Sequence, residues 1–554
     1  MLHPEEERRH RLSASVFGRL RQPLAGNGSS GRGVPTGNLC LRYHDPVPTY
    51  HVENFGCRAT QADGAALERQ FEARGLNRAA PTDADFVVLN SCTVTASADQ
   101  DARAAIRRVR RQNPLARIIV TGCYAQRAPQ EVAALPGVTA VIGNSHKHQL
   151  AEIVLPSLKV NREGHDFGRA AGTLHPIPPS TPQAAGAADR MAFVSLSALT
   201  ENAEPKTENL IYVSDIFAHT ELLAAPIFES AEAVETLRTR PNLKVQEGCG
   251  NRCSFCIIPS VRGHSRSLPL PQVIREMNAL VAAGYREVVI SGINLGRWGR
   301  ETGFGLAPHA TGIGTPDIDF QRPTPGSPKP DLAFLVRAIL AHTQLEKLRI
   351  SSVEPMDWTR DLIALIASSP RVAKHAHLPL QSASDSVLRR MNRKYRPWHY
   401  REKIEEIRAA MPTAAIGADV MTGFPGETDA DFEATRRFIE DLPFTYLHVF
   451  TYSARPGTPA ASLPHQVPVH VARERNHVLR DLAAGKKLAF MRSFVRTSLP
   501  AITLNLVHSR PAGEFTEALT DNYLKLYLKG RQPPNRWIIA PIHAAEDGAL
   551  VSCT

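Results

Sequence analysis

The sequence predicts an α/β protein with three folded parts: an N-terminal doubly wound α/β domain, a central partial (β/α)6 barrel and a small C-terminal β-barrel. Short apolar runs alternate with segments of helical periodicity over residues 50–142 and again from residue 243 onward, which is typical of parallel sheets. After residue 493, apolar residues alternate with polar ones, and this pattern favours β-strands.

Breaks in composition predict where these parts begin and end. Residues 1–48 are basic and rich in Gly, Arg and Ser, and we expect a disordered leader there. Residues 158–238 contain Pro-rich and Ala-rich runs, and residues 300–330 are rich in Pro, so both stretches predict linkers or surface insertions. The expected domains are 49–157, 239–490 and 491–554.

Composition also limits where in the cell the protein is expected and which partners it is expected to bind. No apolar run reaches the ~18 residues of a membrane span, and no secretory signal is evident, so we expect a cytoplasmic protein. Eight cysteines in 554 residues are too sparse for a disulfide framework, which favours cysteines that bind metal in a reducing compartment. The net charge of +11 favours a polyanionic partner without identifying one.

Three cysteines follow the expected strands of the N-terminal domain. These strands lie near 50–55, 85–90 and 117–122, and Cys57, Cys92 and Cys123 come shortly after them; we call these residues the N-terminal trio. Because the carboxyl ends of parallel strands meet at one edge of a sheet, the three thiols are expected to converge there. A cluster held by three thiolates is favoured over three unrelated buried thiols.

Six strands are expected in the central domain, with helices between them. Val273, Ile274, Met277, Leu280 and Val281, for example, recur at helical spacing. The expected strands are 243–247, 287–291, 347–352, 375–380, 414–420 and 445–451.

Cys249, Cys253 and Cys256, the central trio, follow the first of these strands. Soft thiolates favour an iron–sulfur cluster or zinc, and three of them on a cubane leave one iron without a protein ligand. An amino and a carboxylate group, such as those of S-adenosylmethionine, are suited to that open iron. The alternative is a zinc site completed by His264, but structural zinc sites usually carry two ligand pairs.

The central trio, with Phe255 before its last cysteine, resembles the radical S-adenosylmethionine superfamily. Both trios, together with four further motifs, are similar to its methylthiotransferase family, which replaces a C–H hydrogen with a methylthio group. The motifs are Arg349-Ile-Ser-Ser-Val-Glu-Pro355, His377-Leu-Pro-Leu-Gln-Ser382, Gly423-Phe-Pro-Gly-Glu-Thr428 and Tyr452-Ser-Ala-Arg-Pro-Gly-Thr458.

The resemblance implies two 4Fe-4S clusters, one on each trio, and S-adenosylmethionine as a further cofactor. Arg262-Gly-His-Ser-Arg-Ser267 and Ser291-Gly-Ile-Asn-Leu-Gly296 resemble the members that modify carbon 2 of N6-threonylcarbamoyladenosine at position 37 of tRNA. An electron donor and a sulfur source are implied as partners. Alternative substrates are isopentenyladenosine in tRNA and an aspartate of a ribosomal protein, and the alternative of another class is a non-enzymatic iron–sulfur regulator that binds RNA.

Polar and glycine residues at the ends of the central strands are candidates for binding S-adenosylmethionine, although each polar side chain has the alternative of tying down its own loop. The candidates are Ser291, Gly292, Ser352, Glu354, Gln381, Asp419, Gly423 and Glu427. Arg262 and Arg266 are expected to contact the carboxylate of S-adenosylmethionine or an RNA phosphate, because a guanidinium binds either anion. No catalytic side chain is assigned beyond the cluster ligands.

The C-terminal part resembles a TRAM domain, a small β-barrel that binds RNA. Lys525, Lys529, Arg531 and Arg536 are expected at phosphates, with Tyr523 and Tyr527 available for base stacking. A solvated strand face is the alternative. The family commonly has Asn where this chain has Thr60, so a contact near the N-terminal trio is expected to differ.

Overall fold

The computed structural model describes residues 47–56, 58–155, 210–218, 239–301, 330–511 and 513–553. Nearly all of the expected leader, most of the 158–238 insertion and the Pro-rich stretch at 300–330 lie outside these ranges. Within them, no helix is long and apolar enough to cross a membrane.

The N-terminal domain is built on a parallel sheet with the strand order β2-β1-β3-β4-β5-β6. Its strands are β1 (Thr49–Asn54), β2 (Asn77–Arg78), β3 (Phe86–Ser91), β4 (Arg117–Gly122), β5 (Val138–Gly143) and β6 (Leu210–Tyr212). Its helices are α1 (Arg58–Glu72), α2 (Ala96–Gln112), α3 (Cys123–Arg127), α4 (Pro129–Ala133) and α5 (Leu150–Val154), and short 3-10 turns are η2 (Lys147–Gln149) and η3 (Ile216–Ala218).

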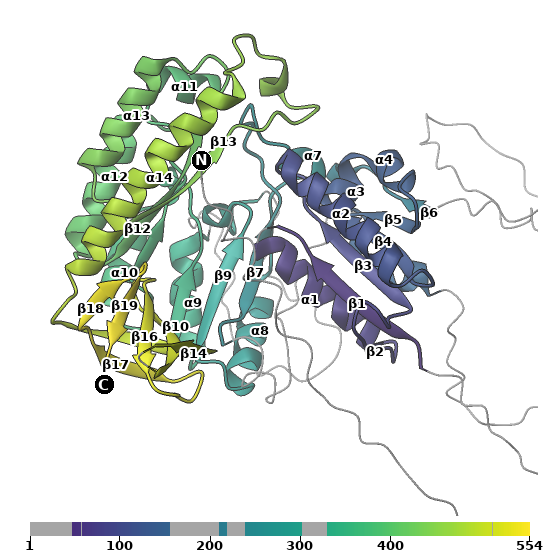
Figure 1. Ribbon diagram of the computed structural model, residues 1–554, viewed down its shortest axis with the longest axis horizontal. Helices are drawn as coiled ribbons and strands as arrows, with labels where there is room; N and C mark the ends of the chain where they lie inside the picture. The colour runs from purple at the N-terminus through teal and green to yellow at the C-terminus, as the bar shows by residue number, and fades with distance from the viewer. Residues whose placement is uncertain are drawn as a thin grey trace, which may run out of the picture. The chain divides into compact units, whose positions relative to one another are not determined.

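Both faces of this sheet are covered, which explains why the first four residues of β3 are apolar. Val87 and Leu89 pack toward α2, whereas Phe86 and Val88 pack toward α1. Figure 1 shows α1 and α2 near this sheet. The expected doubly wound arrangement is therefore confirmed, and it places the ends of β1, β3 and β4 at one edge.

The central domain contains the six expected parallel strands in two hydrogen-bonded groups, β10-β9-β7-β8 and β11-β12-β13. The strands are β7 (Asn242–Glu247), β8 (Arg266–Ser267), β9 (Glu287–Gly292), β10 (Lys347–Ile350), β11 (His375–His377), β12 (Ala415–Thr422) and β13 (Tyr446–Thr451). A parallel bridge between Leu348 and Val372 connects the two groups. The short antiparallel strand β8 is the one addition to the expected set in the described part of this domain.

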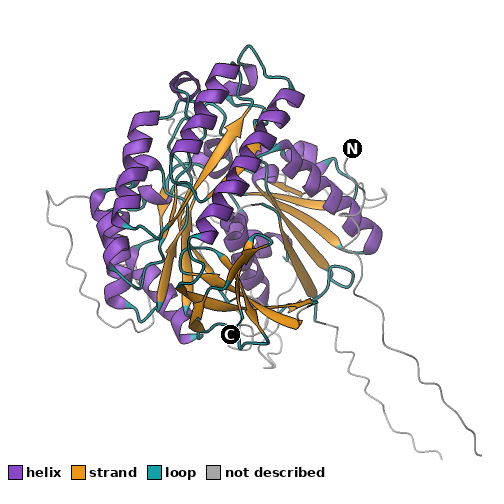
Figure 2. Ribbon diagram, turned by 60° about the vertical axis from the view of Figure 1, so that its left-hand side comes forward, coloured by secondary structure: helices purple, strands orange, loops and turns teal. Residues whose placement is uncertain are grey.

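Helices run along the outer side of these strands (Figure 2). They are α7 (Ile258–Arg262), α8 (Leu270–Ala282), α9 (Leu332–His342), α10 (Arg360–Ser368), α11 (Asp385–Arg390), α12 (Pro397–Ala410), α13 (Asp429–Asp441) and α14 (Val469–Arg492), with 3-10 turns η4 (Leu295–Arg297), η5 (Pro355–Asp357) and η6 (Pro459–Ser462). Several begin at a side chain that accepts a hydrogen bond from the first turn, which satisfies one of its exposed N–H groups. These caps are Asp331 (α9), Thr359 (α10), Ser384 (α11) and Thr428 (α13).

The strand expected at 375–380 is shorter than its apolar pattern suggests. β11 ends at His377, although the Leu378 and Leu380 N–H groups still donate to carbonyls of β12 at 2.9 and 3.1 Å. Leu378 and Leu380 are the alternate positions that face β12, whereas Pro379, between them, has no N–H to donate to a strand on the opposite side.

The C-terminal part is a curled, mostly antiparallel sheet with the order β17-β14-β15-β16-β19-β18. Its strands are β14 (Ser498–Arg510), β15 (Gly513–Thr520), β16 (Lys525–Lys529), β17 (Trp537–Pro541), β18 (Ala544–Glu546) and β19 (Ala549–Ser552). Leu526 and Leu528 lie in its apolar core, while Lys525 and Lys529 are exposed. Tyr527, which points to the other face, is buried with Phe515 and Ala549, so side chains on both faces of this strand are buried.

The turn between β15 and β16 packs against the amino ends of the central strands. The Arg349 guanidinium donates to the carbonyl oxygen of Asp521 at 3.1 Å and to Glu287 at 2.7 Å. The Tyr523 ring lies 4.6 Å from the His375 ring. Tyr523, expected to stack on RNA bases, therefore contacts the central domain, because the turn that carries it enters the floor of the barrel.

Candidate functional site

The loop that carries the central trio joins β7 to α7 at the carboxyl end of the sheet. Gly248 has φ +69°, and a side chain there would lie 1.9 Å from the carbonyl oxygen of His264, so only glycine fits. The Cys249 N–H donates to the Gly263 carbonyl at 3.1 Å, and the Ser254 N–H donates to the Met391 carbonyl at 3.1 Å. The loop is thus held from two directions, and its three cysteine residues are half-buried.

Hydrogen-bond donors surround these sulfurs. Cys249 Sγ accepts from Asn294 Nδ2 at 3.5 Å, and Cys253 Sγ accepts from the Arg393 guanidinium at 3.3 Å. Burial raises the pKa of the Cys256 thiol to about 12, so this thiol requires a bound metal to act as a thiolate near neutral pH. The donors fit a metal-bound sulfur, because outer hydrogen bonds orient ligands and tune the metal they hold.

His264, the residue expected to complete a zinc site, lies against an aromatic side chain, since its ring packs on the Phe217 ring with centroids 4.9 Å apart.

At the carboxyl ends of the central strands, several buried polar atoms have no hydrogen-bond partner among the described residues. They include Ser291 Oγ, Asn294 Oδ1 and Gln381 Oε1. An unpaired buried polar atom is costly, so such atoms indicate where a ligand binds. Gln381 also has φ +61°, a strained conformation for a residue with a side chain. The chemistry of this donor and acceptor set fits the amino, carboxylate and hydroxyl groups of S-adenosylmethionine.

Asp419 lies on β12, and its carboxylate is within 3.2 Å of His377 Nε2. Burial works to raise the pKa of Asp419, but the hydrogen bond from His377 and the neighbouring cationic groups lower it below its usual value. Ser352 is half-buried in the loop after β10. Asp419 is therefore an anionic acceptor on the inner side of the barrel.

Two other residues that were expected to contact S-adenosylmethionine are bound to protein groups in the structure. Glu354 forms an ion pair with Arg393. Glu427 accepts from the Gly423 N–H at 2.7 Å and from Arg475 at 2.7 Å, so it fastens its own loop to α14.

The two glycine candidates are required by close packing. At Gly423 a side chain would lie 2.4 Å from the Ala472 Cβ, and at Gly292 it would lie 2.8 Å from the Gln246 side chain. Both positions let neighbouring elements approach closely.

Two residues near the central trio were not predicted. Asn294 follows β9, so the rule that places ligands at strand ends would have found it. Arg393 follows α11, 140 residues from the thiol of Cys253 that it contacts, and no local pattern indicates its role.

The N-terminal trio is described for two of its three members, since Cys57 lies outside the described residues. Cys92 directly follows β3 and Cys123 directly follows β4, and the preceding residues Ser91 and Gly122 are paired in register. A side chain at Gly56 would lie 2.9 Å from Cys92 Sγ. The loop that leads into Cys57 therefore passes against Cys92, at the sheet edge where Cys123 also lies.

Cys123 is buried against the central domain. It packs with Ile257 and Val261, and its sulfur accepts a hydrogen bond from Arg262 Nε at 3.3 Å. Arg262, expected to meet S-adenosylmethionine or RNA, is instead only 2% exposed and is bound to protein groups. Its segment lies at the contact between two domains, and in the structure its guanidinium is bound by Glu247 and Cys123. For Arg266, the other arginine expected at a ligand, burial and the nearby charge of Arg262 lower the pKa of the guanidinium.

A second contact joins the two domains beside Cys92. The Arg455 guanidinium donates to Thr93 Oγ1 at 2.9 Å and forms an ion pair with Asp99. Arg127 pairs with the same Asp99 carboxylate at 3.0 Å. The motif 452–458 thus attaches the end of the central domain to the segment that follows Cys92.

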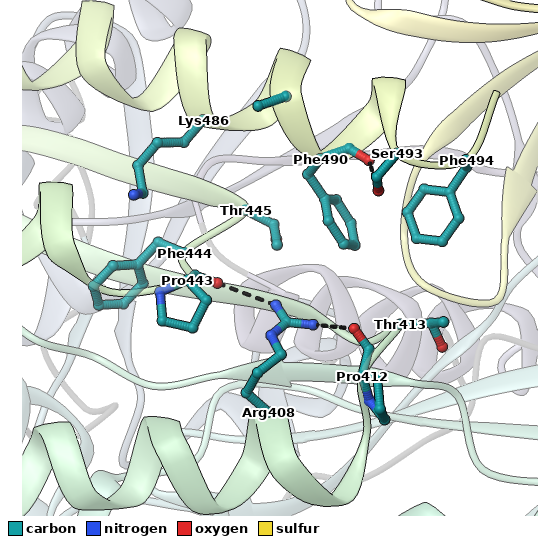
Figure 3. Close-up of a pocket in the computed structure, with 11 residues that line it drawn as sticks. Arg408, Pro412, Thr413, Pro443, Phe444, Thr445, Lys486, Phe490, Ser493 and Phe494 are labelled. Carbon is teal, nitrogen blue, oxygen red and sulfur yellow. Dashed lines mark hydrogen bonds between the residues drawn. The ribbon is translucent and has the colours of Figure 1, made fainter.

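A pocket of about 470 Å³ lies at the opposite, amino ends of β12 and β13 (Figure 3). The Arg408 guanidinium crosses it and donates to the carbonyls of Pro412 and Pro443 at 2.6 and 3.1 Å. Because ligands in such barrels bind at the carboxyl ends of the strands, this pocket is separate from the candidate site.

Comparison with known proteins defines the class first. Residues 243–439 match the model of the radical SAM superfamily, and residues 49–143 match the model described as uncharacterized protein family UPF0004. The central domain therefore binds S-adenosylmethionine and a 4Fe-4S cluster, as that superfamily does.

The relatives then define the family. The threonylcarbamoyladenosine tRNA methylthiotransferase MtaB of Aquifex aeolicus is 30% identical over 86% of this chain and 96% of its own, and that of Bacillus subtilis is 31% identical over 88% and 91%. The tRNA-2-methylthio-N(6)-dimethylallyladenosine synthase of Thermobifida fusca is 33% identical over 78% and 73%. The chain belongs to the radical S-adenosylmethionine methylthiotransferase family.

Among solved structures, the chain is similar to the radical S-adenosylmethionine methyltransferase TsrM from Kitasatospora setae. The identity is 13%, the TM-score is 0.44, and the match covers 75% of this chain and 77% of TsrM.

Proposed function

We propose that this protein is a tRNA methylthiotransferase that modifies carbon 2 of N6-threonylcarbamoyladenosine at position 37 of tRNA. The relatives named MtaB, similar over most of both chains, support this substrate. The contact of Cys123 with Arg262 carries the proposal, because it puts a thiol of the N-terminal trio against the segment that follows the central trio. An enzyme that removes a hydrogen atom from one carbon and attaches a methylthio group to the same carbon requires two such sites close together.

In this proposal the central trio holds one 4Fe-4S cluster and the N-terminal trio, Cys57, Cys92 and Cys123, holds a second. The first cluster would supply the one-electron reduction of S-adenosylmethionine, and the second would supply the sulfur for transfer. Burial of Cys92 and Cys123 and the donors around Cys123 support a metal-ligand role for the N-terminal trio.

The protein's own task is to bind, orient and exclude water. Ser291, Asn294 and Gln381 offer buried polar atoms to S-adenosylmethionine, and Asp419 offers an acceptor. Asn294 also donates to Cys249 Sγ, so one side chain orients a cluster ligand and faces the cofactor. Positions after β12 and β10, including Gly423, Glu427 and Glu354, shape the walls by fixing their loops.

The partners in this proposal are tRNA, an electron donor and a sulfur source, and the location is the cytoplasm. In the C-terminal sheet Lys529 is exposed, whereas Arg510 lies over the Tyr527 ring at 3.9 Å. Arg531 and Arg536 are exposed as well, and Lys525 is exposed but pairs with Glu517 at 3.0 Å, so all four residues stay candidates for phosphate contacts. Tyr527, already covered by Arg510, serves as part of the sheet.

The experiment is the variant Cys92→Ala in the reconstituted, reduced enzyme. We expect it to cleave S-adenosylmethionine while methylthiolated tRNA disappears, because only the second site is damaged. Cys249→Ala should lose both activities, and Cys553→Ala, an exposed cysteine at the tail, should lose neither. Normal product from Cys92→Ala would contradict the proposal.

A second candidate substrate is N6-dimethylallyladenosine, favoured by the 33% identity to the Thermobifida fusca enzyme. Mass spectrometry of tRNA nucleosides from a deletion strain separates the two. We expect loss of the methylthio-threonylcarbamoyl nucleoside alone; loss of the dimethylallyl species would favour the second candidate. Protein that binds tRNA but never cleaves S-adenosylmethionine would instead be a regulator.

A further inference from the structure

Five charged side chains are buried together between the N-terminal and central domains. Asp63 comes from α1, Lys147 from η2, Lys244 and Glu247 from β7, and Arg262 from α7. Each is at most 5% exposed. Asp63 pairs with Lys147 at 3.1 Å and with Arg262 at 3.2 Å, and Lys244 pairs with both carboxylates. We call these five residues the buried ion cluster.

Arg262 connects this cluster to a thiol of the N-terminal trio. One guanidinium nitrogen donates to Glu247 Oε1 at 2.6 Å, and Nε on the same group donates to Cys123 Sγ at 3.3 Å. The planar guanidinium holds its N–H groups in fixed directions, so the positions of the carboxylate and the sulfur determine each other. Lysine, with a single ammonium, cannot hold both in this way.

Glu247 in turn belongs to the strand end that leads into the central trio. It precedes Cys249 by two residues, and the intervening Gly248 has the constrained turn described above. A short chain of buried contacts therefore runs from Cys123 through Arg262 and Glu247 to Cys249.

We propose that Arg262 is the positioning residue that couples the two cluster sites, and that its hydrogen bond to Cys123 raises the reduction potential of the second cluster. The proposal rests on the proposed function, since it requires a cluster on the N-terminal trio. Hydrogen bonds to the sulfurs of a cluster favour its reduced, more negative state and so raise its potential. A permanent positive charge within hydrogen-bond distance acts in the same direction.

The test isolates the second cluster. The full chain with Cys249, Cys253 and Cys256 all changed to Ala is reconstituted with iron and sulfide, and the reduced fraction is followed by electron paramagnetic resonance during a redox titration. At the midpoint of this background, Arg262→Gln is expected to lower the ratio of reduced to oxidised cluster at least tenfold. For a one-electron couple this is a shift of 59 mV to lower potential.

Arg455→Gln is the matched control. Arg455 is also a buried arginine between the domains, but it binds Thr93 and Asp99 and, among described residues, no thiol. We expect it to leave the potential unchanged. If Arg262→Gln prevents cluster loading, Arg262→Lys keeps the buried charge while losing the two-directional contact, and it is expected to shift the potential the same way.

Each other outcome overturns the inference. An unchanged potential in a loaded Arg262 variant removes the coupling role while the second cluster stands. An equal shift of the reduction potential in Arg455→Gln would mean that the potential responds to the docking of the two domains and not to the hydrogen bond from Arg262. A background protein that holds no cluster refutes the second-cluster assignment itself, and the inference falls with it.

Discussion

Asp63→Asn is expected to destabilise the contact between the N-terminal and central domains strongly. Asp63 is 2% exposed and carries three ion pairs, with Lys147, Lys244 and Arg262. The amide keeps the volume of the side chain but removes its charge, so three buried cations are left to share Glu247. Breaking a buried ion pair by removing one partner costs about 3–5 kcal/mol, because an uncompensated charge stays buried.

The assay is urea denaturation at neutral pH, monitored by circular dichroism. The slope m of the free energy of unfolding against urea concentration is compared between wild type and variant, to confirm that both expose the same surface on unfolding. Asp361→Asn is the matched control. Asp361 pairs with Arg337, and both side chains are about half exposed, so its loss should cost less than about 1 kcal/mol. A loss for Asp63→Asn as small as that of the control would refute the reasoning.

The difference in stability between the wild type and Asp63→Asn should also depend on pH. Burial alone would raise the pKa of Asp63, but the charges of Lys147, Lys244 and Arg262 hold it well below its usual range. A lowered pKa in the folded state contributes stability that is complete above the unfolded pKa, about 4, and is lost as pH falls toward the folded pKa. The wild type should therefore exceed Asp63→Asn in stability by a constant amount from pH 7 to about 5, and the difference should shrink below pH 4. A gap that widens in acid would contradict this.

Two further predictions concern packing. Gly417→Ala would put a methyl group 1.9 Å from the Tyr446 ring and should cost about 1–3 kcal/mol or more, whereas Gly485→Ala, with nothing within 4 Å in an exposed helix, should stabilise by about 0.5–1 kcal/mol. Melting temperatures that move in the same direction in both variants would contradict the packing argument. Arg349→Met leaves the buried Glu287 with only its longer ion pair to Arg240, at 3.6 Å, and should cost up to about 3–5 kcal/mol. It also removes a contact to the C-terminal turn, so limited proteolysis should cleave the C-terminal sheet away faster; an unchanged cleavage rate would count against that contact.

The strand positions, and the places of Cys92, Cys123 and Cys249 after strand ends, could be predicted from the sequence. The first four residues of β3 are apolar because both faces of its sheet are covered, and Cys92 follows the strand directly. The six strands of the central domain could be found for the same reason. These features are local, since burial of a short segment requires an apolar run and a strand end requires a change in that run.

The partners of the charged residues were decided only by the tertiary structure. No sequence motif marks Asp63 or Lys147, yet both are buried in one ion cluster with Arg262, across 84 to 199 residues of chain. Arg262 was expected at a ligand and contacts Cys123, and Tyr523 was expected at RNA and contacts the barrel floor. Which charge faces which depends on how separately folded domains dock, and hydrophobic periodicity carries no information about that.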